Sequence, residues 1–157
     1  GGTTTAYAAQ STDGSPFVQL RVEHSDKCLT VESGKIGGGA KTVQQTCADD
    51  LDNQLFELKA AGSGNLSVRA KHSGRCLSAG NSSDWDVAQY FCSGDSSQNW
   101  RVMMVEVAKG LYELRPADVL EYCLTIPGAS HDDGVKATVV KCDGASSQRW
   151  RLQQASS

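Results

Sequence analysis

Apolar and polar residues alternate along short segments of the chain, and the same kind of segment returns three times. Residues 17–22, 65–69 and 111–115 interleave apolar and polar side chains in this way. A period of two is typical of a β-strand with one buried face. No window keeps a helical period over three turns, so the pattern predicts an all-β domain. Stretches rich in glycine, serine and aspartate separate the strands and predict turns and loops, at residues 32–39, 80–84 and 127–134.

A unit of about 45 residues organises these segments into three repeats. Each unit has a Cys-Leu segment, a second cysteine 16 or 19 residues later, and a Gln-x-aromatic segment after that. The first cysteines, Cys28, Cys76 and Cys123, lie 48 and 47 residues apart. Four short strands per unit predict a closed, threefold all-β architecture that leaves few open strand edges. A sandwich of six or seven strands stays an alternative, whereas three units are too few for a propeller.

The repeats define the expected domain boundaries. One domain should cover residues 17–153, and residues 154–157 should form a short tail. Residues 1–16 carry little apolar bulk and have the composition of a flexible linker, with Gly1 and Gly2 in part a cloning remnant. Such a tether in front of a compact domain suggests a piece of a longer secreted chain. The three repeats are expected at about residues 17–63, 64–110 and 111–153.

Composition excludes several classes of function. The 157 residues include 15 basic and 18 acidic ones, and this net charge of −3 argues against a nucleic-acid partner. No apolar run approaches the roughly 18 residues of a membrane span, and no signal peptide opens the chain. The six cysteines are widely spaced, which indicates disulfides in an oxidising compartment, although 15 pairings are possible.

Metal, cofactor and catalytic motifs are absent from the sequence. No Cys-x-x-C pair suggests a zinc or redox site, and His24 and His72 occupy the same turn position in two repeats rather than a ligand set. The chain also lacks Gly-x-Ser-x-Gly, a phosphate loop and His-Glu-x-x-His. We therefore expect a binding module without a cofactor rather than an enzyme.

The repeated Cys-Leu, second cysteine and Gln-x-Trp elements resemble those of ricin B chain-type lectins and family-13 carbohydrate-binding modules. The resemblance covers about residues 16–153. It implies a β-trefoil of twelve strands with pseudo-threefold symmetry and up to three sugar pockets. It also implies core positions for Phe56, Trp100 and Trp150, with a glutamine two residues before each that ties the local turn and borders the pocket.

The resemblance further implies one disulfide within each repeat. Each bridge would close a loop of about 20 residues and stabilise the fold by about 3 kcal/mol through restriction of the unfolded chain. The implied pairs are Cys28–Cys47, Cys76–Cys92 and Cys123–Cys142.

A sugar pocket of this family takes an aspartate after Cys-Leu, an aromatic residue two positions before the second cysteine, and an asparagine beside the Gln-x-Trp glutamine. The aspartate position holds Thr30, Ser78 and Thr125 here. A hydroxyl is shorter than a carboxylate and neutral, so it cannot clamp two sugar hydroxyls. This departure weakens the case for the usual galactose-type recognition.

Repeat two is the best pocket candidate, because it keeps the aromatic residue. Tyr90 is expected to stack on a sugar ring, the alternative being an edge aromatic that packs on its own hairpin. Trp85 lies in a loop of serines and aspartates, where it would either stack on the ligand or pin the loop down. The candidate residues of this repeat are Ser78, Asp84, Trp85, Tyr90 and Gln98.

Repeats one and three are weaker candidates, and the alternative is that both are vestigial and purely structural. Asn53 would then stabilise a turn, and Asp132 would lie on a solvated loop. Their candidate residues are Thr30, Gln45, Asn53 and Gln54 in repeat one, and Thr125, His131, Asp132 and Gln148 in repeat three.

The sequence therefore predicts a secreted, monomeric, non-catalytic module that binds a polysaccharide or oligosaccharide and is tethered to a glycoside hydrolase. The alternative is a trefoil that binds a protein partner, as an inhibitor or a toxin-type receptor-binding domain, and whose sugar pockets have degenerated. The residues do not name the sugar.

Overall fold

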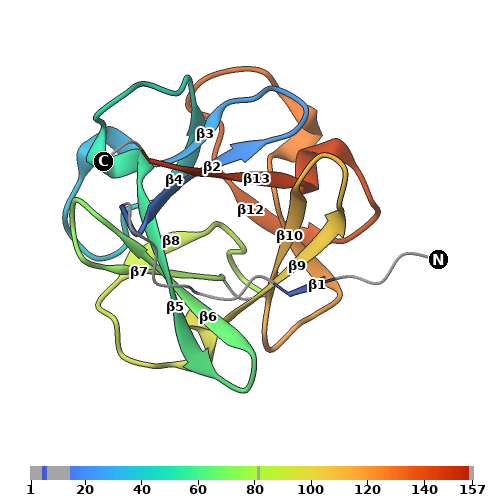
Figure 1. Cartoon of the computed structure of the whole chain (residues 1–157). Helices are drawn as coiled ribbons and strands as arrows, with labels where there is room; N and C mark the ends of the chain where they lie inside the picture. Colours follow the sequence, from blue (N-terminus) through green and yellow to red (C-terminus); the bar gives the residue numbers. More distant parts are fainter. Residues whose placement is uncertain (1–4, 7–14, 81, 156–157) are drawn as a thin grey trace.

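The computed structural model describes residues 5–6, 15–80 and 82–155, and within them it contains strands and single 3₁₀ turns but no α-helix. The three repeats form three sectors around one centre, coloured blue to cyan, green to yellow, and orange to red in Figure 1. Each repeat contributes four strands. They are β2 (Phe17–Val22), β3 (Cys28–Val31), β4 (Thr42–Gln45), β5 (Phe56–Gly62), β6 (Asn65–Ala70), β7 (Cys76–Ser78), β8 (Ala88–Tyr90), β9 (Trp100–Glu106), β10 (Leu111–Pro116), β11 (Tyr122–Thr125), β12 (Thr138–Lys141) and β13 (Trp150–Gln154).

The two outer strands of each repeat form a closed six-stranded barrel. The pairings run β2–β5, β5–β6, β6–β9, β9–β10, β10–β13 and β13–β2, so the first and last of these strands are neighbours. Inward residues such as Leu20 and Val68 are fully buried, as the period of two predicted. Phe56, Trp100 and Trp150 open β5, β9 and β13 and lie in the core. Closure of the sheet excludes the sandwich alternative and confirms the β-trefoil.

The two inner strands of each repeat form a hairpin, namely β3–β4, β7–β8 and β11–β12. Isolated β-bridges connect each hairpin to the hairpins of the other two repeats around the pseudo-threefold axis. Residues next to one hairpin strand therefore lie beside the hairpin of another repeat. By this geometry Lys41 of repeat one reaches repeat two. The bridges pair Lys41 with Ala88, Asp86 with Thr138, and Val43 with Lys136.

One disulfide staples each repeat, as expected. The bridges are Cys28–Cys47, Cys76–Cys92 and Cys123–Cys142.

The ends of the chain are described only in part. Of the segment predicted as a linker, Thr5–Ala6 forms β1 and pairs with β9, and residues 15–16 lead into β2. Residues 1–4 and 7–14 of the predicted linker, and residues 156–157 of the predicted tail, lie outside the described residues. Among the described residues, no helix is long and apolar enough to cross a membrane.

Repeat two grips a loop of repeat one through side chains that bind main-chain carbonyls. The Nε2 atom of His72 lies 2.7 Å from the carbonyl oxygen of Lys35. The amide of Gln89 donates to the carbonyls of Lys35 and Gly37, each at 2.9 Å, and Arg75 Nε donates to the carbonyl between them at 2.7 Å. These bonds give the His-Ser-x-x-Cys turn of the sequence a role in fastening a neighbouring loop.

Repeat one grips a loop of repeat three in the same way. His24 Nε2 lies 2.7 Å from the carbonyl oxygen of Ser130, and the amide of Gln44 donates to that carbonyl at 2.9 Å. Lys27 pairs with the carboxylate of Asp133 at 3.1 Å, and this contact holds the pKa of Asp133 below its ordinary value. His24 and His72 thus each fasten a loop of a neighbouring repeat.

At the third joint, where repeat three meets the loop of repeat two, the side-chain contact is apolar, and the amide of Val139 donates to the carbonyl of Trp85 at 3.2 Å. Tyr122 occupies the position before the first cysteine that Lys27 and Arg75 hold in the other repeats. Its ring meets the ring of Trp85 edge to face, with 5.1 Å between centroids. Trp85 is half-buried and packs against the core cluster. An aromatic contact therefore replaces the polar grip at this joint.

Candidate functional site

Two adjoining hollows on repeat two share the Tyr90 ring. We call them the Asp84 pocket, of about 280 Å³, and the Phe91 pocket, of about 490 Å³. Ser78, Tyr90 and Ser97 line both of them. The Asp84 pocket is completed by Lys41, Ala79, Gly80, Asp84 and Asp86, and the Phe91 pocket by Gly38, Arg75, Phe91, Ser93, Asp95 and Gln98.

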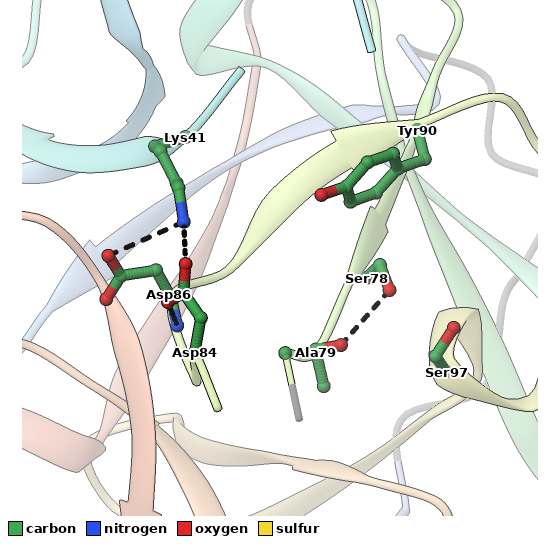
Figure 2. Close-up of a pocket in the computed structure, with 8 residues that line it drawn as sticks. Lys41, Ser78, Ala79, Asp84, Asp86, Tyr90 and Ser97 are labelled. Atoms are coloured by element: carbon green, nitrogen blue, oxygen red, sulfur yellow. Dashed lines mark hydrogen bonds and ion pairs between the residues drawn. The ribbon is translucent and has the colours of Figure 1, made fainter. Parts of the chain in front are cut away.

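Tyr90 provides an open aromatic face. It ends β8, and 47% of its surface is exposed. Its hydroxyl points across the Asp84 pocket in Figure 2. The loop of repeat one passes the ring edge, where a Cβ on Gly38 would lie 3.9 Å from a ring carbon. A flat, exposed aromatic ring of this kind can stack on the C–H face of a sugar.

Two serine hydroxyls stand below the ring. Ser78 ends β7 and is 8% exposed, and its hydroxyl donates to the carbonyl of Ala79 at 3.1 Å but accepts no hydrogen bond from the described residues. Within the described residues the hydroxyl of Ser97 has no hydrogen-bond partner. Ser97 is held in place through its carbonyl, which accepts the amide of Ala79 at 3.0 Å. The two hydroxyls can therefore serve sugar hydroxyls as donor or acceptor.

The opposite wall of the Asp84 pocket is charged. Lys41 Nζ reaches from repeat one and lies 2.5 Å from the carboxylate of Asp84 and 3.6 Å from that of Asp86 (Figure 2). The hydrogen bond from Lys41 holds the pKa of Asp84 below its ordinary value and raises the pKa of Lys41. A Cβ at Gly80 would lie 1.8 Å from the Asp84 carbonyl oxygen, so glycine is required where the loop closes.

The glutamine of each Gln-x-aromatic segment lies buried beneath the pocket position. Gln98 donates to the carbonyl before Cys92 at 2.7 Å and accepts the amide after it at 3.0 Å. Gln54 and Gln148 likewise donate to the carbonyl of the residue before Cys47 and Cys142 and accept from the amide of the residue after it, at 2.9 to 3.0 Å. Gln54 and Gln148 also donate a second N–H to Thr30 and Thr125, so both of their amide N–H groups are paired. Among the described residues, Gln98 Nε2 donates only to the carbonyl of Phe91, which leaves one N–H at the base of the Phe91 pocket.

In repeats one and three, the hydroxyl that follows the Cys-Leu pair is hydrogen-bonded within the protein. Thr30 donates to the carbonyl of Cys28 at 3.0 Å and accepts from Gln54 at 3.2 Å. Thr125 repeats this arrangement, donating to its own Cys-Leu carbonyl at 2.7 Å and accepting from Gln148 at 3.2 Å. Both threonines are buried. They hold the position of the family's aspartate but present no free polar atom.

The remaining repeat-one residues also differ from the repeat-two set. Asn53 donates to the carbonyl of Val31 at 2.9 Å, which supports the turn. Gln45 lies on β4 opposite Cys28 and takes the place of the aromatic residue. The structure therefore brings no aromatic face together with these side chains.

In repeat three, Val140 stands at the aromatic position and is 41% exposed. His131 and Asp132 are exposed, but the main chain beside them is fastened to repeat one: the carbonyl of His131 accepts from Lys27, and that of Asp132 accepts from Gln44 at 2.8 Å. The His131 ring lies edge-on to His24.

Of the repeat-two candidates, Ser78, Asp84 and Tyr90 line the Asp84 pocket, and Gln98 lies at the base of the Phe91 pocket. Trp85 packs instead against Tyr122 and the core. Lys41 was not among the expected residues. The sequence offers one signal for it: Lys41 comes just before strand β4. In a β-trefoil this position lies beside the hairpin of the neighbouring repeat, as the bridge to Ala88 shows.

Comparison with known proteins agrees with this architecture. Residues 16–150 match the family described as "Ricin-type beta-trefoil lectin domain". The designed threefold-symmetric protein ThreeFoil has 31% sequence identity, with a TM-score of 0.82 over 89% of this chain and 99% of that one. The exo-beta-1,3-galactanase 1,3Gal43A of Clostridium thermocellum has 21% identity and a TM-score of 0.81, over 93% of this chain and 32% of the enzyme.

A curated relative, the beta-agarase AgaB34 of Agarivorans albus, is 30% identical over 71 residues. That match covers 45% of this chain and 16% of the agarase, so the chain spans a small part of the relative's length.

The closed barrel with its three hairpins defines the class of protein as a β-trefoil. More narrowly, the chain belongs to the ricin-type β-trefoil lectin family, whose domains bind carbohydrates and are non-catalytic.

Proposed function

We propose that this chain is a secreted, non-catalytic module that binds a neutral polysaccharide through repeat two. The observation that carries the proposal is the half-exposed Tyr90 ring standing over two available hydroxyls. A sugar ring needs such a platform together with a few polar groups that fix its orientation. Repeats one and three serve as structural copies, because their equivalent threonine hydroxyls are bonded within the protein.

Two relatives support a galactan as the polysaccharide. One is named as an agarase and the other as an exo-beta-1,3-galactanase, and both are longer than the part this chain matches. We therefore expect agarose or β-1,3-galactan to be bound, by a monomeric domain tethered to a polysaccharide-degrading enzyme. Three disulfides support a role outside the reducing interior of the cell.

A single shallow site should bind weakly. We expect a dissociation constant on the order of 0.1–1 mM, which corresponds to about 4–5.5 kcal/mol. With one active repeat, the module gains no avidity from simultaneous binding at other repeats.

Affinity electrophoresis in gels that contain agarose, β-1,3-galactan, xylan, arabinan or β-glucan tests the proposal. The parent should be retarded by a galactan, and Tyr90→Ala should weaken binding at least about tenfold through loss of the stacking face. Val140→Ala, at the equivalent position of repeat three, is the matched control and should migrate like the parent. Retardation that survives Tyr90→Ala would refute the role of repeat two. No retardation of the parent in any gel would refute polysaccharide binding and favour a protein partner.

A further inference from the structure

Resting on the proposed function, we infer that the Phe91 pocket is a second sugar subsite. Repeat two then binds at least two consecutive residues within a glycan chain rather than a single terminal sugar. Three residues, Ser78, Tyr90 and Ser97, line both hollows. A chain that stacks on Tyr90 in the Asp84 pocket can therefore continue directly into the Phe91 pocket.

Phe91 gives this second hollow its own apolar face. Its side chain is 75% exposed, although a phenylalanine is ordinarily buried. The fold does not require an aromatic residue here, because Thr46 and Lys141 hold the same place before the second cysteine of the other repeats. An exposed ring beside Tyr90, on a surface that could carry a polar residue, fits contact with a ligand.

The hollow also has polar groups suited to sugar hydroxyls. Arg75 uses its Nε atom to hold the neighbouring loop, so the N–H groups of its two terminal nitrogens stay available as donors. Within the described residues the carboxylate of Asp95 has no partner and can accept. Leu51 and Ala145 occupy the Asp95 position in the other repeats. Among the described residues at these equivalent positions, donor, acceptor and aromatic face thus occur together only in repeat two.

Titration calorimetry with oligosaccharides of one, two and four residues tests the inference, prepared from whichever of agarose or β-1,3-galactan retards the parent. The parent should bind the two-residue sugar at least about fivefold more tightly than the single sugar. Phe91→Ala should abolish this gain without changing the affinity for the single sugar, and Asp95→Asn should reduce it.

Val107→Ala is the matched control, because Val107 is also an exposed apolar residue, at 70%, and lies outside both hollows. It should leave the gain intact. A Phe91→Ala variant that keeps the parent's gain, or a parent that gains nothing from a second sugar residue, would overturn the second subsite while polysaccharide binding stands. A parent that binds no glycan of any length would overturn both.

Discussion

Repeat two has the same strands and hairpin as repeats one and three, but the hydroxyl that follows its Cys-Leu pair makes different contacts. Thr30 and Thr125 are buried and bonded to the glutamine below them. Ser78 is also buried, but among the described residues its hydroxyl bonds only the carbonyl of Ala79, and it lines a pocket beneath an aromatic ring. The difference teaches that the Cys-Leu-x position can either strengthen the repeat or face a ligand. Under the proposed function, the two uses are divided between repeats in this chain.

The joints between repeats show the same division. Loops of repeats one and three are held by hydrogen bonds from His72, His24 and their neighbours, whereas the loop of repeat two is held by the packing of Trp85 on Tyr122. A polar grip occupies the main-chain carbonyls of the loop it holds. The apolar joint fixes the same kind of loop through a ring, and Asp84 remains at the pocket rim.

The largest expected effect is the loss of this apolar joint. Trp85→Ala should lower the free energy of unfolding by about 2–3 kcal/mol, through lost burial and the lost ring contact. Tyr122→Ala removes the other ring and should destabilise by a similar amount. Denaturant unfolding with the disulfides intact measures both, and Tyr90→Ala should change stability little because that ring is half-exposed.

The two variants also separate the alternatives for Trp85. If the residue pins the loop, both substitutions reduce sugar affinity to a similar extent through the displaced loop. A Trp85→Ala protein as stable as the parent that nonetheless loses binding would show that the indole itself contacts the sugar.

A smaller effect tests the hydroxyls. Thr30→Val keeps the shape but removes the hydroxyl that donates to the carbonyl of Cys28 and accepts from Gln54, so it should cost about 1–2 kcal/mol. Ser78→Ala should change the free energy of unfolding by less than about 0.5 kcal/mol, as removal of a weakly bonded hydroxyl at a pocket surface does. Equal losses in chemical unfolding would mean that the hydroxyls of the two repeats are used alike.

The fold could be predicted from the sequence because the same strand pattern and motifs recur in each of the three repeats. The strand period and the recurring unit predicted a closed, threefold all-β architecture, and the resemblance that the repeated motifs carry implied the three disulfides and the buried aromatic residues. The family's pocket pattern also pointed to Tyr90 and Ser78, and the structure places both at one hollow, because these positions are defined within a single repeat.

The contacts that could not be predicted are those between side chains of different repeats. Lys41 acts in a pocket whose loop lies 43 residues further along the chain, and Trp85 meets Tyr122 from the next repeat. A local pattern carries no signal for such neighbours. The choice of Thr30 and Ser78 between an internal bond and a pocket depends on hydroxyl direction, which residue type does not determine.

The smallest expected effect concerns the charged wall. Because the pKa of Asp84 is lowered in the folded protein by the hydrogen bond from Lys41, folding favours its ionised form. The resulting stabilisation is present above the unfolded pKa of about 3.9 and is lost as the pH falls through the lower, folded pKa. Exposure of both side chains to solvent keeps this contribution small and sensitive to salt.

Carboxyl-carbon NMR titration of the parent and of Lys41→Met measures the effect. The variant should return the pKa of Asp84 towards its ordinary value and reduce the salt dependence of that titration, since the charge of Lys136 remains. Asp133 is the internal control, since its lowered pKa comes from Lys27 and should persist in the same variant. An unchanged Asp84 titration in Lys41→Met would mean that the amide of Asp86, which donates to Asp84 at 2.9 Å, and the charge of Lys136 sustain the lowered pKa without Lys41. In that case the ionisation of the pocket wall would not depend on repeat one.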